Sequence, residues 1–196
     1  MDPLFDALEN RLTSRPPRAL NLPGLVMREA AVLVPLLVRE GAPHILFTKR
    51  PSTLRHHAGQ YSFPGGTRDP EDTTPLHTAL RETREELGID VSGVRVLGAL
   101  DEVPTLTEFR IQPFVGVIPH GVEYKPNPDE VEFILEVPLA ELMNPAIRRT
   151  ERRNVRGMEY DVDFYTYGSH VIWGATGRIL RHLLRLAAEP SRSPSE

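Results

Sequence analysis

Hydrophobic residues recur at helical spacing in three segments of this chain. The first covers residues 4–12 and follows Asp2-Pro3, the second covers residues 75–87, and the third follows Gly168-Ser169. An Asp or Thr before a proline is typical of a helix N-cap and first turn, and a glycine such as Gly88 commonly ends a helix. The pattern therefore predicts an N-terminal helix, a helix over residues 75–87, and a C-terminal helix with an apolar stripe.

Other segments are rich in β-branched residues and leucine, which favours strands. Residues 29–39 and 43–49 are separated by Glu40-Gly41-Ala42 and are expected to form a hairpin. Three further strands, a short helix and a second hairpin are expected, in that order, over residues 94–100, 111–118, 131–137, 139–142 and 158–167. Because strands and helices alternate through hairpins as well as crossovers, we expect an α/β fold in which helices cover a mixed sheet.

Residues 50–72 show neither the helical nor the strand period and are rich in Pro, Gly, His and Arg. A loop of this length in a compact domain usually has a function. We expect residues 1–188 to form one domain, and residues 189–196, in which proline and serine dominate, to form a disordered tail.

Composition and charge narrow the classes of function. The 196 residues include 23 Lys and Arg against 27 Asp and Glu, which gives a net charge of −4. We therefore expect neither nucleic-acid binding through many neutralised phosphates nor binding to an anionic membrane surface. There is no cysteine, so disulfides, thiolate nucleophiles and Cys-based zinc sites are excluded. With an acidic N-terminus and no apolar run longer than residues 30–38, we expect a cytoplasmic protein without a secretion signal or membrane anchor.

Three glutamates, Glu82, Glu85 and Glu86, lie within the segment RETREE of the predicted helix over 75–87. Residues i, i+3 and i+4 of a helix share a face, so the three carboxylates are expected in one acidic patch. Two carboxylates about 4 Å apart repel by roughly 4 kcal/mol at an effective dielectric of about 20, more than an exposed Arg–Glu pair returns. A Mg²⁺ or Mn²⁺ ion that also binds substrate phosphate relieves this repulsion, because hard cations prefer carboxylate oxygens. The alternative is a solvated helix face on which the arginines and glutamates form exposed pairs.

The glycine pair Gly65-Gly66, after Pro64, precedes this helix by one loop. Glycine lets the backbone approach a ligand closely, and a turn that leads into a helix N-terminus suits phosphate. This context favours a metal-dependent phosphate site over the solvated helix face.

The segment 65–89 resembles the signature of the Nudix hydrolases, which cleave a nucleoside diphosphate linked to another group. That signature is Gly-Gly, an acidic loop, and then Arg-Glu-aliphatic-x-Glu-Glu-x-Gly-aliphatic. The chain departs from it twice: the upstream acid, Asp72 or Glu71, lies one residue further from Arg81 than is usual, and Thr83 replaces an aliphatic residue. The resemblance implies a Nudix-type α/β/α sandwich with a mixed β-sheet.

A second resemblance concerns the substrate. The segments LFTKR (46–50), LRHHAGQ (54–60), FPGGTRD (63–69) and VIWGAT (171–176) resemble motifs of the coenzyme A pyrophosphatase branch of that family. Tyr61-Ser62 stands where a small aliphatic pair is more usual. The resemblance implies hydrolysis of the diphosphate of coenzyme A, and of its thioesters, to 3′,5′-ADP and 4′-phosphopantetheine.

Coenzyme A carries a 3′-phosphate in addition to its diphosphate, so its pocket needs additional positive donors. The candidate substrate-binding residues are basic side chains in and before the long loop, together with the two glycines: Lys49, Arg50, Arg55, His57, Arg68, Gly65 and Gly66. The alternative is that the basic residues face solvent and that His57 holds the loop through a hydrogen bond. Trp173 is expected in the core and not under an adenine ring.

The resemblance also implies roles for the acidic residues. Glu82 and Glu86 are expected to bind Mg²⁺ or Mn²⁺ most directly, with Glu85 as a third ligand or as the group that deprotonates water. Arg81 is expected to orient Glu85. The competing candidates for the base lie in a polar loop before a strand: Asp129-Glu130 and Glu132.

Two alternatives to coenzyme A hydrolysis stay open. The first is hydrolysis of another nucleoside diphosphate derivative, such as ADP-ribose, NADH or a dinucleoside polyphosphate. The second is a non-catalytic module that senses a nucleotide, against which the three mutually repelling acids argue.

Overall fold

The computed structural model describes residues 2–53, 57–155 and 158–189. The helices are α1 (Pro3–Thr13), α2 (Pro75–Leu87), α3 (Leu139–Met143) and α4 (Gly174–Ala188), with the 3₁₀ helices η1 (Val91–Gly93) and η2 (Pro145–Ile147). The strands are β1 (Arg28–Arg39), β2 (Ala42–Lys49), β3 (Tyr61–Ser62), β4 (Gly65–Thr67), β5 (Arg95–Ala99), β6 (Val103–Pro104), β7 (Phe109–Val117), β8 (Phe133–Pro138), β9 (Arg148–Val155), β10 (Met158–Tyr167) and β11 (His170–Ile172). The helices predicted over residues 4–12, 75–87 and 139–142 are confirmed.

In the described part of the chain, eight strands form the main sheet. Its central order is β3-β2-β1-β7-β5, with β8 beside β2, β4 beside β1 and β6 beside β7. β1 pairs with β2 in antiparallel orientation, as the predicted hairpin requires, and with β7 in parallel orientation. The sheet is therefore mixed, and the predicted α/β class is confirmed.

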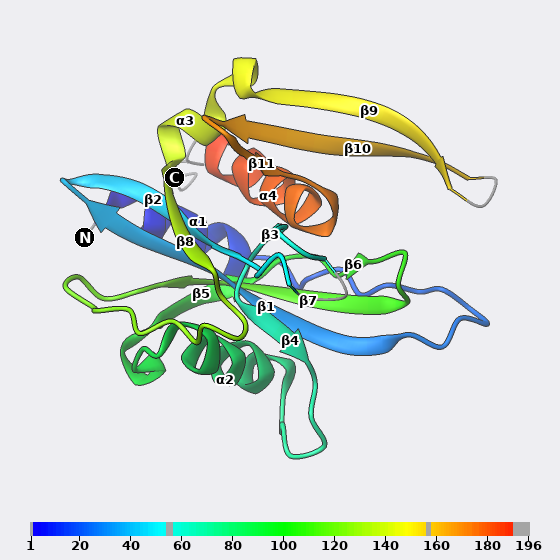
Figure 1. Cartoon of the computed structure of the whole chain (residues 1–196), viewed down its shortest axis with the longest axis horizontal. Coiled ribbons are helices and arrows are strands. Elements are labelled where there is room, and N and C mark those ends of the chain that lie inside the picture. Colours follow the sequence, from blue (N-terminus) through cyan, green and yellow to red (C-terminus); the bar gives the residue numbers. More distant parts are fainter. Residues whose placement is uncertain (1, 54–56, 156–157, 190–196) are drawn as a thin grey trace, which may run out of the picture.

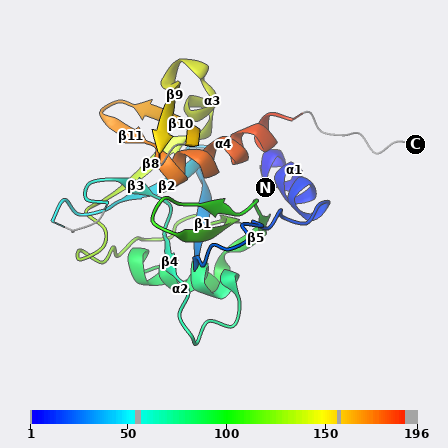
Figure 2. The ribbon, with the colours of Figure 1, turned by 90° about the vertical axis from the view of Figure 1, so that its right-hand side faces the viewer.

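Helices cover both faces of the main sheet (Figures 1 and 2). Strand β1 packs against helices on both of its faces. Ala31 and Leu33 pack with Ala79 of α2, whereas Val34 and Leu36 belong to the core cluster that includes α1 and α4. Because both faces of β1 are covered, its sequence is a continuous apolar run and does not alternate with polar residues. The layers are thus α2, the sheet, and α1 together with α4.

Helix α2 begins and ends where the sequence predicts. The Thr74 side chain accepts a hydrogen bond from the backbone N–H of His77 at 3.1 Å, and Pro75 occupies the first helical turn. Gly88 ends the helix in the left-handed conformation, with φ 66°, and its N–H donates to the Arg84 carbonyl at 2.8 Å. Both signals are local, and together they fix which turns of α2 carry the glutamates.

A second, antiparallel sheet has the strand order β11-β10-β9 among the described residues and lies beside α4 (Figure 1). β9 and β10 form a long hairpin that projects from the body of the molecule, with β9 at the edge of the sheet. The buried Asp163 of β10 attaches this hairpin, because its carboxylate binds Arg148 of β9 at 2.9 Å and Arg181 of α4 at 3.1 Å. The base of the hairpin is therefore tied to the C-terminal helix.

Three expectations about secondary structure are wrong. Residues 50–72 do not form one long loop, because β3 and β4 lie within them, paired with β2 and β1. These strands have two and three residues, which is too short to show a strand period. Residues 158–167 form a single strand whose hairpin partner is 148–155. The C-terminal helix begins only at Gly174, because residues 170–172 form β11.

Helix α4 ends at Ala188, and residues 190–196 of the expected tail lie outside the described ranges. The organisation as one domain over 1–188 stays a prediction. No helix within the described ranges is both long and apolar enough to span a membrane.

Candidate active site

The three glutamates of α2 have different surroundings. The side chain of Glu82 is 17% exposed and Glu86 is 5% exposed, whereas the side chain of Glu85 is 45% exposed. Successive helical residues are rotated by about 100°, so i and i+4 point in nearly the same direction and i+3 is turned away from i+4. The structure thus directs Glu82 and Glu86 toward the sheet and leaves Glu85 at the solvent-exposed side.

Glu86 is the most buried of the three. Its carboxylate accepts hydrogen bonds from the Gly65 N–H at 3.3 Å and from the Thr48 hydroxyl at 3.4 Å. Both bonds are long, so they compensate a buried negative charge poorly. Burial, aided by the negative charges of Glu82 and Glu130 and opposed by the Gly65 hydrogen bond, raises the pKa of Glu86 to about 8.

Glu82 lies against the glycine pair of β4. A Cβ atom at Gly66 would lie 2.5 Å from the Glu82 carboxylate, so a larger residue there would displace that carboxylate. Gly65, with φ 152°, has a backbone conformation that favours glycine. The glycine pair therefore lies beside Glu82 and Glu86, and it precedes α2 by one loop, residues 68–74, as the sequence predicts.

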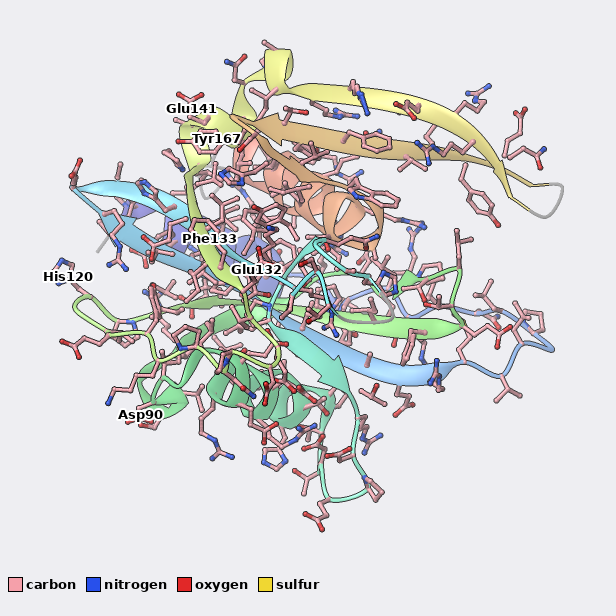
Figure 3. All side chains as sticks on the ribbon, viewed as in Figure 1. Asp90, His120, Glu132, Phe133, Glu141 and Tyr167 are labelled. Carbon is pink, nitrogen blue, oxygen red and sulfur yellow. The ribbon has the colours of Figure 1, made fainter. Side chains whose placement is uncertain are left out.

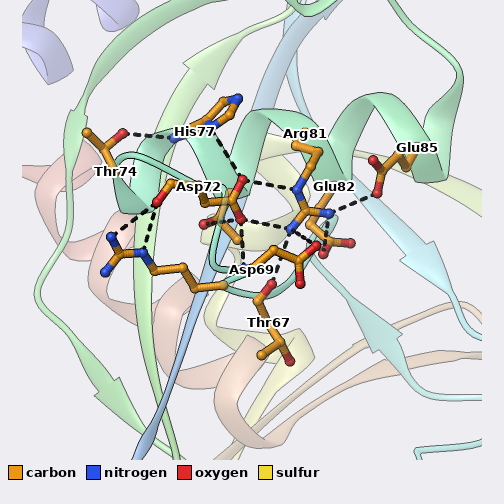
Figure 4. A network of polar contacts seen from close by, with 10 residues as sticks. Thr67, Asp69, Asp72, Thr74, His77, Arg81, Glu82 and Glu85 are labelled. Atoms are coloured by element: carbon orange, nitrogen blue, oxygen red, sulfur yellow. Dashed lines mark hydrogen bonds and ion pairs between the residues drawn. The ribbon is translucent and has the colours of Figure 1, made fainter.

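Arg81 connects α2 to the loop that precedes it (Figure 4). Its guanidinium donates to Asp72 Oδ2 at 2.9 Å, to Asp72 Oδ1 at 3.1 Å and to the Thr67 carbonyl at 3.2 Å. The Asp72 side chain is 1% exposed and also accepts hydrogen bonds from the Thr78 hydroxyl at 2.9 Å and the Asp69 N–H at 3.0 Å. These bonds, above all those from Arg81, hold the pKa of Asp72 well below its ordinary value. Of the two candidates for the upstream acid, Asp72 is the one that binds Arg81.

The same guanidinium contacts two glutamates of its own helix. Arg81 Nη1 lies 3.0 Å from Glu82 Oε1 and 3.0 Å from Glu85 Oε2. Hydrogen bonds from Arg81 to Asp72, together with the nearby Glu82, raise the pKa of the guanidinium above its ordinary value. Arg81 is therefore a permanent positive charge positioned to orient Glu82 and Glu85.

The polar loop before β8 contributes one acid to this site. The loop is held to α2, because the Asn127 N–H donates to the Glu86 carbonyl at 2.9 Å. Burial raises the pKa of Glu82 against the effect of Arg81, and the charge of Glu130 raises it further, as it does for Glu86. The negative charge of Glu130 thus acts on both side chains. We call Glu82, Glu86 and Glu130 the carboxylate cluster.

Glu132 is occupied elsewhere. Its Oε1 accepts a hydrogen bond from Lys49 Nζ at 2.6 Å, and its Oε2 accepts one from the Ser52 N–H at 3.2 Å. The nearby Asp129 has its N–H bound to Asn127 Oδ1 at 3.1 Å, which forms a local turn. Among the acids of this loop, Glu130 is the one whose charge raises the pKa of both Glu82 and Glu86.

The described residues contain no group of three or more His, Asp or Glu side chains that would hold a metal ion as it stands. The donors nevertheless suit a divalent cation. Glu86 is buried with only long hydrogen bonds, and it lies beside the negative charges of Glu82 and Glu130. A hard divalent ion prefers such oxygens and compensates their charge, so the residues present fit Mg²⁺ or Mn²⁺.

The predicted basic residues have different surroundings. Arg50 follows β2, and its charge lowers the pKa of Glu86; its Nε is buried and has no hydrogen-bond partner in residues 2–53, 57–155 and 158–189. Arg68 is engaged elsewhere, because it binds Glu29 at 2.6 Å and the Asp72 carbonyl at 3.1 Å. Lys49, at the end of β2, is bound by Glu132.

The remaining basic residues lie in the loop between β2 and β3. His57 has a positive φ of 56°, and its Nδ1 lies 2.9 Å from Gln60 Oε1. This contact matches the structural alternative of a loop-holding hydrogen bond. Arg55 lies outside the described residues.

Sequence reasoning missed Tyr61, Phe133 and His170 as neighbours. They come from three different strands, so no local pattern connects them.

Trp173 is half-buried and stacks on Phe164 with ring centroids 5.8 Å apart, in keeping with a packing role.

Comparison with known proteins identifies the relatives of this chain. A model of the NUDIX domain matches residues 27–157. Proteins named uncharacterized Nudix hydrolase NudL are similar over most of their length. The Photorhabdus laumondii protein is 42% identical over 156 residues, which is 80% of this chain and 83% of the relative. The Escherichia coli O6:H1 protein is 38% identical over 172 residues, which is 87% of this chain and 89% of the relative.

Two solved structures share the fold. A MutT/nudix family protein from Enterococcus faecalis has a TM-score of 0.56 and 15% identity, covering 89% of this chain and 68% of that one. The Nudix hydrolase RenU from M. smegmatis has a TM-score of 0.50 and 21% identity, covering 61% of this chain and 82% of that one. At such identities the likeness shows the fold alone.

Proposed function

Because the chain belongs to the Nudix hydrolase family, we propose that its substrates are coenzyme A and the coenzyme A thioesters. The products are 3′,5′-ADP and 4′-phosphopantetheine. The observation that carries the phosphate-binding part of the proposal is Arg50, whose buried Nε has no hydrogen-bond partner among the described residues and whose charge acts on Glu86. A substrate phosphate between Arg50 and the carboxylate cluster supplies the missing acceptor.

Nudix hydrolases generally use divalent metal ions, and we assign Mg²⁺ or Mn²⁺ to Glu82 and Glu86. When bound, the ion supplies positive charge to the diphosphate oxygens. Arg81 orients Glu82 and Glu85 through contacts of 3.0 Å each. Gly66 lets the backbone of β4 lie directly against Glu82, where any larger residue would displace the carboxylate.

The reaction is the hydrolysis of a phosphoanhydride. The oxygen of a water molecule bonds to one phosphorus, the bond from that phosphorus to the bridging oxygen breaks, and the leaving phosphate keeps the electron pair. The water proton passes to a carboxylate, for which Glu85 and Glu130 are the candidates. Glu132 is excluded from this role because Lys49 and the Ser52 N–H already bind it.

Recognition of the 3′-phosphate is assigned to the basic loop between β2 and β3. Arg55 and His57 lie in the segment that resembles the coenzyme A motif, and Lys49 ends the strand that leads into it. Arginine favours forked contacts with phosphate, which suits a terminal dianion. The generic family signature does not include this loop, and so it is the part of the chain that favours coenzyme A.

The direct test incubates the full chain with coenzyme A and Mg²⁺ and identifies the products by liquid chromatography and mass spectrometry. Equal amounts of 3′,5′-ADP and 4′-phosphopantetheine are expected, and Glu86→Gln serves as the inactive control. ADP-ribose, NADH and a dinucleoside tetraphosphate are assayed in parallel at the same concentration. Cleavage of one of these with coenzyme A left intact overturns the proposal, and so does the absence of any cleavage.

A further inference from the structure

Three rings from separate strands meet at one end of the main sheet: Tyr61 of β3, Phe133 of β8 and His170 of β11. The Tyr61 hydroxyl and His170 Nδ1 lie 2.5 Å apart, and the two rings meet edge to face with centroids separated by 5.4 Å. The Phe133 ring stacks on His170, with centroids 5.9 Å apart and 11° between the planes. Tyr61 therefore fixes His170, and His170 supports Phe133. We call these three residues the aromatic cluster.

Phe133 is 47% exposed, although Tyr61 beside it is buried. Figure 3 shows Phe133 and Glu132 together at the start of β8. An isolated exposed phenylalanine needs no explanation, but a ring that is backed by a second, nearly parallel ring presents an ordered aromatic surface. Such a surface suits a flat ligand.

The aromatic cluster adjoins the carboxylate cluster through β2. Lys49 of β2 pairs with Tyr61 of β3 and with Phe133 of β8. The preceding residue, Thr48, points to the opposite face of the sheet and contacts Glu86 at 3.4 Å. Phe133 and Glu86 thus lie on opposite faces of the sheet but at the same end of its strands.

The rim between the two clusters carries charge suited to phosphate. Arg50 follows Lys49 directly at the end of β2, and its buried Nε has no partner among the described residues. Glu130 lies three residues before Phe133, and three extended residues span at most about 11 Å. The Cα atoms of Glu130, in the carboxylate cluster, and Phe133, in the aromatic cluster, are therefore no more than that distance apart.

We propose that the exposed face of Phe133, supported by His170, stacks on the nucleobase of the substrate. This inference rests on the proposed function for the identity of the base, which is adenine in coenzyme A. Every nucleobase has a π-face, and aromatic side chains bind these faces without needing a particular hydrogen-bond pattern. The pantetheine arm has no planar ring and gains nothing from a parallel pair of rings.

The competing explanation is that the aromatic cluster only joins the sheets. Tyr61 belongs to the main sheet and His170 to the smaller one, so their hydrogen bond links the two. A joint of this kind affects the melting temperature but not the affinity for a nucleotide. Ligand affinity is therefore the measurement that separates the two roles.

The experiment measures binding by isothermal titration calorimetry to the full chain in the presence of Mg²⁺. The probes are 3′,5′-ADP, which carries adenine, and inorganic pyrophosphate, which has no base. The proteins are the wild type, Phe133→Leu and the control Tyr160→Leu, which removes a 36%-exposed ring from β10. Phe133→Leu is expected to weaken 3′,5′-ADP binding roughly tenfold, equivalent to about 1.4 kcal/mol, and to leave pyrophosphate binding unchanged. Tyr160→Leu is expected to bind both probes like the wild type.

A second variant, Phe133→Trp, keeps an aromatic face and adds a fluorophore. It is expected to retain wild-type affinity for 3′,5′-ADP, and its additional fluorescence is expected to be quenched by that nucleotide but not by pyrophosphate. Unchanged 3′,5′-ADP affinity in Phe133→Leu overturns the proposal. Equal losses for both probes also overturn it, because they indicate a disturbed phosphate site.

The outcome is independent of the coenzyme A assay. If the wild type leaves coenzyme A intact, the proposed function fails, while the comparison of Phe133→Leu with the wild type still tests base stacking. If coenzyme A is hydrolysed and Phe133→Leu binds 3′,5′-ADP normally, the stacking proposal fails and the proposed function stands.

Discussion

Arg81 and Asp72 are joined by two hydrogen bonds, from Nε to Oδ1 at 3.1 Å and from Nη2 to Oδ2 at 2.9 Å. The pair closes the loop between β4 and α2 even though that loop has one residue more than the usual Nudix spacing. The longer spacing therefore does not separate the upstream acid from the arginine. The same arginine contacts Glu82 and Glu85, so the positive charge of Arg81 binds both the loop and these two glutamates.

Asp72→Asn is expected to lower the free energy of unfolding by about 2–3 kcal/mol at pH 7, because it weakens charged hydrogen bonds at a side chain that is 1% exposed. The measurement is urea denaturation of the metal-free protein. Asp69→Asn is the control: that carboxylate is 60% exposed and 3.6 Å from Arg81, so its loss is expected to change stability by less than about 0.5 kcal/mol. Equal stability of wild type and Asp72→Asn would contradict a structural role for the pair.

The same pair predicts a dependence of stability on pH. The pKa of Asp72 is lowered in the folded protein, whereas in the unfolded chain it is about 3.9. The stabilisation is therefore present above about pH 4 and is lost as the pH falls below that value toward the folded pKa. Between about pH 4 and pH 2, the free energy of unfolding is expected to fall more steeply in the wild type than in Asp72→Asn. Parallel curves from urea denaturation at several pH values would show that Asp72 is not the responsible acid.

Glu82→Gln and Glu86→Gln are each expected to reduce turnover at ordinary Mg²⁺ by on the order of a hundredfold or more, while the fold is kept. A glutamine keeps the size and helix propensity of glutamate but removes the charge that a cation needs. Steady-state assays with coenzyme A, with circular dichroism to monitor the fold, provide the measurement. Glu71→Gln, at an exposed position of the preceding loop, is the control and is expected to remain active. Wild-type turnover in both glutamate variants would mean that α2 does not carry the metal site.

Mg²⁺ or Mn²⁺ is expected to raise the melting temperature of the wild type, because the ion binds only the folded state and relieves repulsion within the carboxylate cluster. The double variant Glu82→Gln/Glu86→Gln is expected to respond much less. Differential scanning fluorimetry with increasing metal concentration measures both. Equal shifts would place the ion elsewhere on the chain.

The basic loop between β2 and β3 predicts that the enzyme distinguishes substrates that carry a 3′-phosphate from those that lack it. Coenzyme A is expected to be cleaved about ten- to a hundredfold better than 3′-dephospho-coenzyme A, because a charge-assisted contact to a dianion is worth roughly 1.5–3 kcal/mol in kcat/KM. Arg55→Ala is expected to lose most of this advantage and to change little on the dephospho substrate. A general weakening of the fold lowers activity on both substrates together. If the wild type treats both alike, the loop has another role.

The sequence predicted what local signals encode. Helix α2 was predicted at its observed bounds because Thr74 and Gly88 act on neighbouring backbone groups. Strand β11 was missed because its three residues acquire strand geometry only by pairing with β10. The same distinction holds for the site. The spacing of Glu82 and Glu86 predicted their common direction, whereas the effect of the Glu130 charge on them depends on how the chain folds across the sheet. No residue pattern could have brought Phe133 to His170.

The projecting hairpin leaves β9 as an edge strand of the smaller sheet, with backbone groups on its outer side available to another chain. Four of its eight residues are arginine, and only one, Glu151, is acidic. If a second molecule approached this edge, two strands that each carry four arginines and one glutamate would lie side by side, and their net positive charges would repel. The edge is therefore protected from growth into an aggregate by its own side chains. Replacing Arg149 and Arg152 with threonine would keep the strand while removing that protection against self-association.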